Sequence, residues 1–157
     1  MKLTIGKEFK FSASHILPKH PGKCSNLHGH NWKLRVYVIG EVDKETGFVV
    51  DYGEINESVD PIINALDHKH LGQWLQSDPD IQKCIPTNID FVTSSCKTSH
   101  AVLTLPNDFY PSSENLLVWI GDQLLNHKLG KSLGWSKLEL DETDTVCCAL
   151  TREEYDK

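Results

Sequence analysis

Two histidines that lead into a regular alternation of apolar and polar residues constrain the fold of this chain more than any other feature. His28 and His30 are separated by Gly29, and from His30 the apolar residues occupy every second position through Val38. A period of two is typical of a strand with one buried face, so the segment predicts a half-buried β-strand. Both histidines then project from the same face of that strand, and Gly29 allows a neighbouring backbone to come close.

A third histidine lies at the end of the preceding apolar segment. Residues 2–14 alternate loosely and predict a first strand, which is followed by His15. If the two strands pair as antiparallel neighbours, the ring of His15 can join those of His28 and His30. Three neutral imidazoles with a fourth position left open are the usual composition of a catalytic zinc site. No carboxylate is adjacent to His28 and His30 in the sequence, which favours Zn²⁺ over iron held by two histidines and a carboxylate.

Cys24 precedes the histidine pair and has three possible roles. As a fourth ligand, its thiolate would close the zinc tetrahedron and make the metal structural. As a free thiol near the metal, it could donate or accept a proton in catalysis. As a small buried residue it would have neither role, although its polar neighbours Lys23, Ser25 and Asn26 argue against burial.

Two acidic positions further along the chain have competing interpretations. Asp67 is followed by His68, so its carboxylate could orient and polarise that imidazole. The structural alternative is a helix end at which His68, Lys69 and His70 act as favourable cations. Glu142 lies in a predicted turn between two strands, where an acidic side chain is normally solvated and by itself suggests no role.

The remaining pattern predicts the order strand, strand, helix, insert, helix, strand, strand. Residues 48–50 predict a short continuation of the second strand, and residues 51–66 predict a helix that Pro61 kinks or divides. The sequence from Pro111 to Glu114 carries helix-start signals. The last two strands are expected at 135–140 and 145–150. Because strands flank a block of helices, the fold class is α+β.

Length and charge limit the classes of function. The 157 residues suit a single domain spanning 1–157, and the net charge of −6 argues against nucleic acid as the main partner. No stretch is long and apolar enough to predict a membrane span or a signal peptide. The five cysteines are odd in number and resemble no disulfide framework, so we expect free thiols and a cytoplasmic location.

Six segments, taken together and in order, resemble the 6-pyruvoyl-tetrahydropterin synthase / 6-carboxytetrahydropterin synthase family. The resemblance spans the chain except for an insertion at about 72–110. The segments are Phe11-Ser12-Ala13-Ser14-His15, Cys24-x-x-x-His28-Gly29-His30, Gly47-Phe48-Val49-Val50-Asp51-Tyr52-Gly53, Leu66-Asp67-His68-Lys69-His70-Leu71, Ser112-Ser113-Glu114-Asn115 and Glu142-Thr143-Asp144.

The resemblance implies the tunnelling fold. In that fold a four-stranded antiparallel sheet in ββααββ order carries two helices on one face, here with the insertion between the helices. It also implies a homo-oligomer, a trimer or a hexamer of two stacked trimers, in which the sheets join into barrels.

The resemblance also implies a chemistry. Zinc would be held by His15, His28 and His30, and Cys24 would be the general acid/base. Asp67 and His68 would complete a triad across a subunit interface. Glu142 would anchor a pterin ring, with Ser113 and Glu114 nearby. The implied reaction is a lyase reaction on 7,8-dihydroneopterin triphosphate.

Within the family, the spacing from Cys24 to His28 is similar to that of the branch that forms 6-carboxytetrahydropterin in queuosine biosynthesis. A pyruvoyl-forming synthase is the alternative within the enzyme class. A non-catalytic binding module stabilised by zinc, with Cys24 closing the metal shell, is the alternative outside it.

Overall fold

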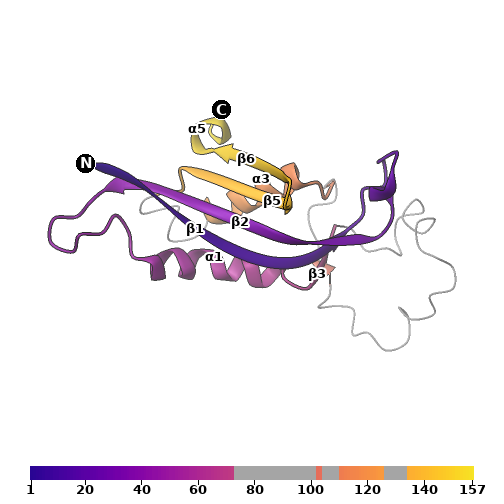
Figure 1. Cartoon of the computed structure of the whole chain (residues 1–157), viewed down its shortest axis with the longest axis horizontal. Helices are drawn as coiled ribbons and strands as arrows, with labels where there is room; N and C mark the ends of the chain where they lie inside the picture. The colour runs from indigo at the N-terminus through magenta and orange to yellow at the C-terminus, as the bar shows by residue number, and fades with distance from the viewer. Residues whose placement is uncertain (73–101, 104–109, 126–133) are drawn as a thin grey trace.

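The computed structural model describes residues 1–72, 102–103, 110–125 and 134–157. In order along the chain, its elements are β1 (Lys2–His15), the 3₁₀ turn η1 (Lys23–Ser25), β2 (His28–Glu41), α1 (Tyr52–Leu66), β3 (Lys69–Leu71), β4 (Val102–Leu103), α3 (Ser113–Leu125), β5 (Lys137–Thr143), β6 (Val146–Thr151) and α5 (Arg152–Tyr155). Strands before and after a helical block confirm the α+β class, and Figure 1 shows β1 and β2 as a long curved ribbon.

The sheet differs from the expected four antiparallel strands. Its order is β4-β3-β1-β2-β5-β6, and β3 pairs in parallel with both β1 and β4. The four expected strands are present as the antiparallel run β1-β2-β5-β6. Strand β3 forms because α1 runs in the same direction as β1 (Figure 1), so the chain leaving the helix passes beside the end of β1, and β4 pairs with β3 in turn. There the backbone N–H of His68 donates to the carbonyl of Ser12 at 2.7 Å.

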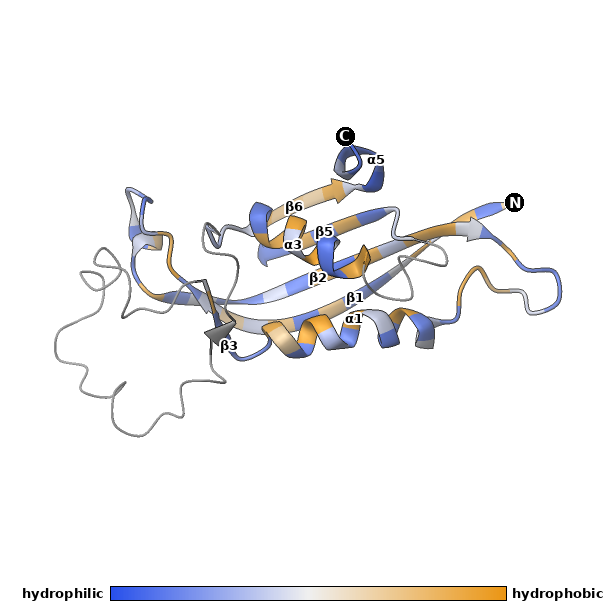
Figure 2. Ribbon diagram, turned by 180° about the vertical axis from the view of Figure 1, so that it is seen from behind, coloured by the Kyte–Doolittle hydropathy of each residue, from blue (hydrophilic) through white to orange (hydrophobic). Residues whose placement is uncertain are grey.

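Helices α1 and α3 cover the same face of the sheet, as Figure 2 shows. The alternation predicted for β2 is present, because Trp32, Leu34, Val36 and Val38 are fully buried against the helices. Each helix contributes an apolar stripe to this core, with Ile55, Val59, Ile62 and Leu66 from α1 and Leu116, Leu117, Ile120 and Leu124 from α3. The core therefore lies between the sheet and two helices that are far apart in sequence.

Two structures expected within residues 48–61 are absent, a strand at 48–50 and a division of the helix at Pro61. Residues 48–50 form no strand, because the backbone N–H of Asp43 donates to the carbonyl of Phe48 and closes a loop there. Pro61 does not divide its helix, which is continuous from Tyr52 to Leu66. Pro61 and the residue four before it, Glu57, lie on the exposed side, where water can bind the carbonyl that lacks an N–H partner. The predicted insertion at about 72–110 falls mostly outside the described residues. None of the described helices is long and apolar enough to cross a membrane.

The face of the sheet opposite the helices carries a network of charged side chains. Arg35 on β2 donates to Glu139 at 3.0 Å and to Asp141 at 2.5 Å, both on β5. Glu139 also accepts from Lys137 at 2.6 Å and from the hydroxyl of Tyr37 at 2.8 Å. The hydrogen bond from Lys137 is the main cause that lowers the pKa of Glu139 to about 2, with Tyr37 and Arg35 adding to it and burial opposing it.

This network predicts an acid-dependent loss of stability. The pKa of Glu139 rises from about 2 to the ordinary 4.5 on unfolding, so the unfolded chain binds the proton first. The free energy of unfolding should therefore fall as pH is lowered from about 4.5 toward 2. Urea unfolding of Glu139→Gln across this range should give a shallower pH dependence than wild type. An identical slope in the two proteins would contradict the assignment.

Candidate functional site

The three predicted histidines meet at one end of the sheet, where β1 ends and β2 begins. In the antiparallel register, His15 is opposite His28 and Ala13 is opposite His30. Because cross-strand partners point to the same face, all three rings project toward the helix side. The Nε2 atoms of His15 and His28 lie 3.1 Å apart. One ligand atom from each histidine and one from Glu142 all lie within 4.8 Å of one another, a grouping that could hold a metal ion.

Gly29 makes this close pairing possible. A Cβ at this position would lie 3.0 Å from the carbonyl oxygen of Ala13 and 3.3 Å from the Cα of Ser14. Both contacts are with backbone, which cannot rotate out of the way. The sequence expectation that Gly29 allows a neighbouring strand to come close is therefore confirmed.

Backbone carbonyls fix the tautomers of two of the histidines. The Nδ1–H of His15 donates to the carbonyl of Pro111 at 2.7 Å, and that of His28 donates to the carbonyl of Asn26 at 2.8 Å. A carbonyl can only accept, so Nδ1 carries the proton in each ring and Nε2 presents a lone pair. Two lone pairs thus face each other across 3.1 Å. A cation that both nitrogens coordinate would turn this repulsion into attraction, and such outer hydrogen bonds are typical of metal-binding histidines.

The protonation state of the cluster fits the same interpretation. Burial is the main cause that lowers the pKa of His15 to about 4, although the bond to Pro111 partly opposes it. Burial also lowers the pKa of His30. His15 is completely inaccessible to solvent, so its imidazole is neutral at neutral pH, which is the form that binds metals.

The ring of His30 offers the third nitrogen that could bind a metal ion. Its Nε2 is buried and has no hydrogen-bond partner within the described part of the chain. The Oε1 of Glu142 lies 3.3 Å away, at ion-pair distance but without hydrogen-bond geometry. A buried nitrogen without a partner is costly, and a metal ion would satisfy it. Three imidazoles whose Nε2 atoms converge therefore fit Zn²⁺ in ligand type and in number.

Trp32 forms the floor of the cluster. Its ring packs edge-on against His15 at 5.3 Å and His30 at 5.4 Å between ring centroids. Its indole N–H donates to the carbonyl of Ala13 at 3.3 Å, and the side chain is fully buried. The histidines are thus supported by the core of the protein and not by a loop.

Glu142 is the member of the cluster that reasoning from the residues did not find. Its Oε1 lies 3.3 Å from the Nε2 atoms of both His15 and His30. No carboxylate is adjacent to the histidines in the sequence, but the fold brings Glu142 beside them. The premise that the site lacks a carboxylate is therefore wrong. Only the family resemblance singled out Glu142, and it implied a contact with a pterin ring instead of one with the histidines. Pro111 and Asn26 act through backbone carbonyls, for which side-chain identity gives no signal.

Cys24 lies outside this cluster. It is half-buried in η1, and its carbonyl accepts from the backbone N–H of Leu17 at 2.9 Å, which holds the loop across the end of the sheet. Its sulfur is not part of the described group that could hold a metal, where the additional ligand atom is a carboxylate oxygen of Glu142. This arrangement favours a free thiol over a thiolate that closes a zinc shell.

Asp67 and His68 do touch, which their adjacency in sequence left open. The backbone N–H of Ser12 donates to one oxygen of Asp67 at 2.8 Å, and the Nδ1 of His68 donates to the other at 2.8 Å. The N–H of Ser12 is the main cause of the lowered pKa of Asp67, followed by His68. His68 adopts the uncommon φ of 57°, a local strain typical of functional positions. Helix α1 ends at Leu66 with Asp67 as its C-cap, so the helix end of the structural alternative is also present, and His68 follows it in the left-handed conformation common at that position.

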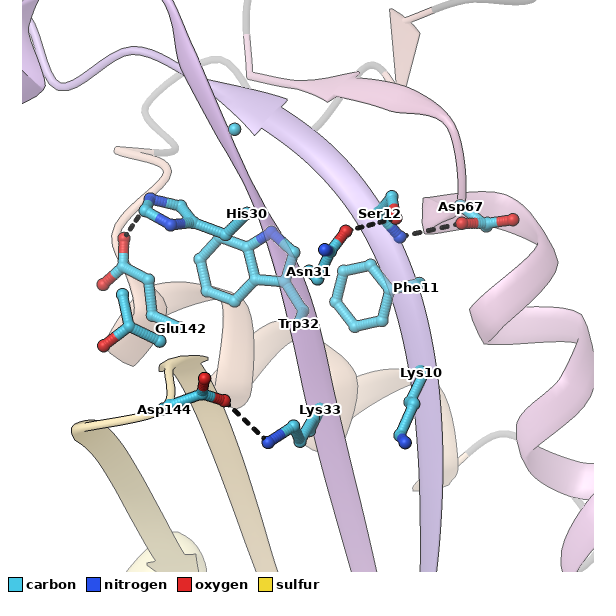
Figure 3. A pocket seen from close by; sticks show the side chains of 12 residues that line it. Lys10, Phe11, Ser12, His30, Asn31, Trp32, Lys33, Asp67, Glu142 and Asp144 are labelled. Atoms are coloured by element: carbon cyan, nitrogen blue, oxygen red, sulfur yellow. Dashed lines mark hydrogen bonds and ion pairs between the residues drawn. The ribbon is translucent and has the colours of Figure 1, made fainter.

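A hollow of about 700 Å³ extends from Asp67 to His30, the one histidine of the cluster that lines it, and Figure 3 shows the side chains of its lining. Asp67 and Ser12 lie at one side, and His30 and Glu142 at the other. Lys10 and Lys33 add positive charge, although Lys33 is paired with Asp144 at 2.9 Å. This volume is within the usual range for small-molecule sites.

Ser113 and Glu114 are the first two residues of α3 and follow Pro111 and Ser112. Ser113 is buried, and its hydroxyl lies 3.4 Å from the Glu114 carboxylate. Both influence the thiol of Cys148, whose pKa burial raises to about 11 with a further contribution from Glu114. They do not line the hollow between Asp67 and Glu142, so the structure leaves their expected contact with a substrate as a prediction.

Known proteins resemble this chain both in sequence and in fold. A sequence model of the 6-pyruvoyl tetrahydropterin synthase family matches residues 4–153. A 6-carboxy-5,6,7,8-tetrahydropterin synthase of Synechocystis is 45% identical over 76 residues, which cover 45% of this chain and 59% of the relative. A 6-pyruvoyl tetrahydrobiopterin synthase of Pongo abelii is 39% identical over 80 residues, covering 43% of this chain and 55% of the relative. Each alignment thus spans less than two thirds of the relative's length.

The fold agrees over a longer range. The structure of Caenorhabditis elegans 6-pyruvoyl tetrahydropterin synthase superposes with a TM-score of 0.66 at 21% identity, covering 96% of both chains. At this identity the likeness is one of fold. Because the sequence model matches almost the entire chain, from near the start of β1 to α5, this protein belongs to the 6-pyruvoyl tetrahydropterin synthase family.

Proposed function

We propose that this protein is a zinc-dependent 6-carboxy-5,6,7,8-tetrahydropterin synthase of queuosine biosynthesis. It would convert 7,8-dihydroneopterin triphosphate and water to 6-carboxytetrahydropterin, acetaldehyde and triphosphate. The observation that carries the proposal is the convergence of three imidazole Nε2 atoms beside a hollow of about 700 Å³ in a member of a pterin synthase family.

His15, His28 and His30 would hold the zinc ion, which as a Lewis acid would polarise a side-chain oxygen of the substrate and stabilise developing negative charge. Support comes from the two carbonyl-fixed tautomers and from the buried Nε2 of His30, which has no hydrogen-bond partner in the described structure.

Proton transfer would be carried out by Cys24 and by the Asp67–His68 pair. The reaction reduces the ring while the side chain is oxidised, so protons must move between side-chain and ring carbons without an external redox partner. Asp67, held by the N–H of Ser12, fixes the Nδ1–H of His68 and leaves its Nε2 free to exchange a proton. Cys24 has a free thiol at the same end of the sheet as the histidines.

Glu142 would bind the pterin ring by accepting from its ring N–H and amino donors, with Ser113 and Glu114 nearby. The position of Glu142 on the wall of the hollow supports this role. We also propose a cytoplasmic homo-oligomer, a trimer or hexamer, in which the triad is completed across a subunit interface. Light scattering of the purified protein would measure the oligomer.

A pyruvoyl-forming synthase is the second candidate. It is supported by the relative of that name from Pongo abelii. The carboxy-forming assignment is preferred because of the spacing between Cys24 and His28 and the relative of that name from Synechocystis.

Mass spectrometry of the products from 7,8-dihydroneopterin triphosphate separates the two. We expect 6-carboxytetrahydropterin together with acetaldehyde. A pyruvoyl product without acetaldehyde would move the protein to the other branch. Absence of any product from metal-loaded protein would overturn the proposed function.

A further inference from the structure

The position of Glu142 relative to the histidines is that of a ligand. In a tetrahedral zinc site with bonds of 2.0–2.1 Å, neighbouring ligand atoms are about 3.3 Å apart. The Oε1 of Glu142 lies 3.3 Å from the Nε2 of His15 and 3.3 Å from that of His30. The Nε2 atoms of His15 and His28 are 3.1 Å apart. Three of the six edges of such a tetrahedron therefore come within about 0.2 Å of this length, and all pairs of ligand atoms lie within 4.8 Å of one another.

A hydrogen bond does not explain these contacts. The Nδ1 of His15 carries the ring proton because it donates to the carbonyl of Pro111, so its Nε2 has no proton to offer to a carboxylate. The contact from Glu142 to His30 also lacks hydrogen-bond geometry. The lone pair on the Nε2 of His15 faces the carboxylate oxygen of Glu142, and a cation between the two atoms would turn this repulsive contact into attraction.

The backbone at Glu142 allows this carboxylate a second position. The pairing of β5 with β6 shifts register between Asp141 and Thr143, and such a bulge re-aims the side chain at the irregular position. The side chain of Glu142 is 19% exposed and lines the hollow that Asp67 borders on the other side. Its carboxylate therefore borders both the histidines and the space that a molecule in the hollow would occupy.

We propose that Glu142 is the fourth ligand of the metal in the substrate-free protein and that it leaves the metal to accept hydrogen bonds from an entering pterin. Pterin binding thereby opens the coordination position that the substrate oxygen needs. This inference rests on the metal and the ligand class of the proposed function. It adds that the Glu142 carboxylate binds first the metal and then the pterin. The metal is therefore shielded until the pterin has bound.

The test uses full-length protein stripped of metal and loaded with Co²⁺, whose visible absorption reports coordination number and ligand type. Wild type is compared with Glu142→Gln and Glu142→Ala, and chelator competition measures metal affinity. The matched control is Asp144→Asn, which removes the same charge nearby from an exposed side chain paired with Lys33. Oxidised neopterin, which carries the pterin ring but cannot react, is the probe.

We expect a four-coordinate spectrum for wild type and Asp144→Asn, and a changed spectrum for both Glu142 variants. Affinity should fall about 100-fold in those variants, since losing even partners outside the coordination sphere costs about 10- to 100-fold. Neopterin should change the spectrum of wild type. If folded Glu142→Gln kept the metal affinity and the spectrum of wild type, Glu142 would not be a ligand. If saturating neopterin left the wild-type spectrum unchanged, Glu142 would not leave the metal when a pterin binds. Failure of wild type to bind one metal per chain would instead overturn the metal of the proposed function.

Discussion

Replacing His28 with alanine is expected to lower metal affinity by about 100-fold or more and turnover by about 10²- to 10⁴-fold. Losing a direct ligand should cost at least as much as losing an outer partner, and Lewis-acid stabilisation contributes several kcal/mol to the barrier. His28 is the suitable target because it is half-buried at the start of β2, whereas His15 is completely buried and its loss would also disturb the core. Metal content by mass spectrometry and steady-state kinetics measure the two effects.

The matched control is His20→Ala. His20 is an exposed histidine of the loop between β1 and β2, and its ring accepts from the N–H of Gly22 outside the cluster. This variant should keep one metal per chain and full turnover. Thermal unfolding of both metal-free variants should match metal-free wild type. A His28→Ala protein that binds metal with wild-type affinity would show that the imidazole cluster is not the metal site.

Cys24→Ala is expected to reduce turnover by about 10²- to 10⁴-fold, the usual contribution of a general acid/base, while the metal remains bound. The structure gives the reason for this separation, because the sulfur of Cys24 is not among the described atoms grouped with the histidines. Cys147→Ala is the control, since this exposed thiol lies on β6, and it should retain full turnover.

The metal measurement decides between the two roles of Cys24. If Cys24→Ala loses both metal and turnover, its thiolate closes the metal shell, and the site is structural. If the variant keeps both, the thiol takes no part in proton transfer. Only retained metal with lost turnover agrees with the general acid/base role.

The parts of this site that sequence predicted are those that local periodicity determines. Alternation along residues 30–38 identified β2 and its buried face, and the spacing of His28 and His30 placed both rings on that face. Gly29 predicted a close strand, and its missing Cβ is indeed what the backbone of Ala13 requires. A period of two depends on backbone geometry alone and needs no knowledge of distant contacts.

The parts that sequence did not predict depend on contacts between distant segments. Glu142 lies near the histidines because β5 pairs with β2, at a position where the pairing of β5 with β6 shifts register, and neither feature has a signature in the residues around Glu142. Strand β3 forms because α1 delivers the chain beside the end of β1. The Phe48 loop shows the opposite error, since Val49 and Val50 pack against the core without joining the ladder, while Phe48 stays exposed.

The contact between Asp67 and His68 was predictable only in part. Neighbours in sequence often point apart, and here the positive φ of His68 and the N–H of Ser12 bring the two groups together. The residue types suggested that Asp67 and His68 interact. The contact itself depends on β1 lying beside the end of α1, where the N–H of Ser12 holds the Asp67 carboxylate.

Titration of metal-free protein with Zn²⁺, with turnover of 7,8-dihydroneopterin triphosphate measured at each addition, tests the central claim most directly. If His15, His28 and His30 form the catalytic metal site, turnover should rise linearly from near zero and reach a plateau at one Zn²⁺ per chain. Full turnover in thoroughly stripped protein, or zinc binding at one per chain without any turnover, would contradict it.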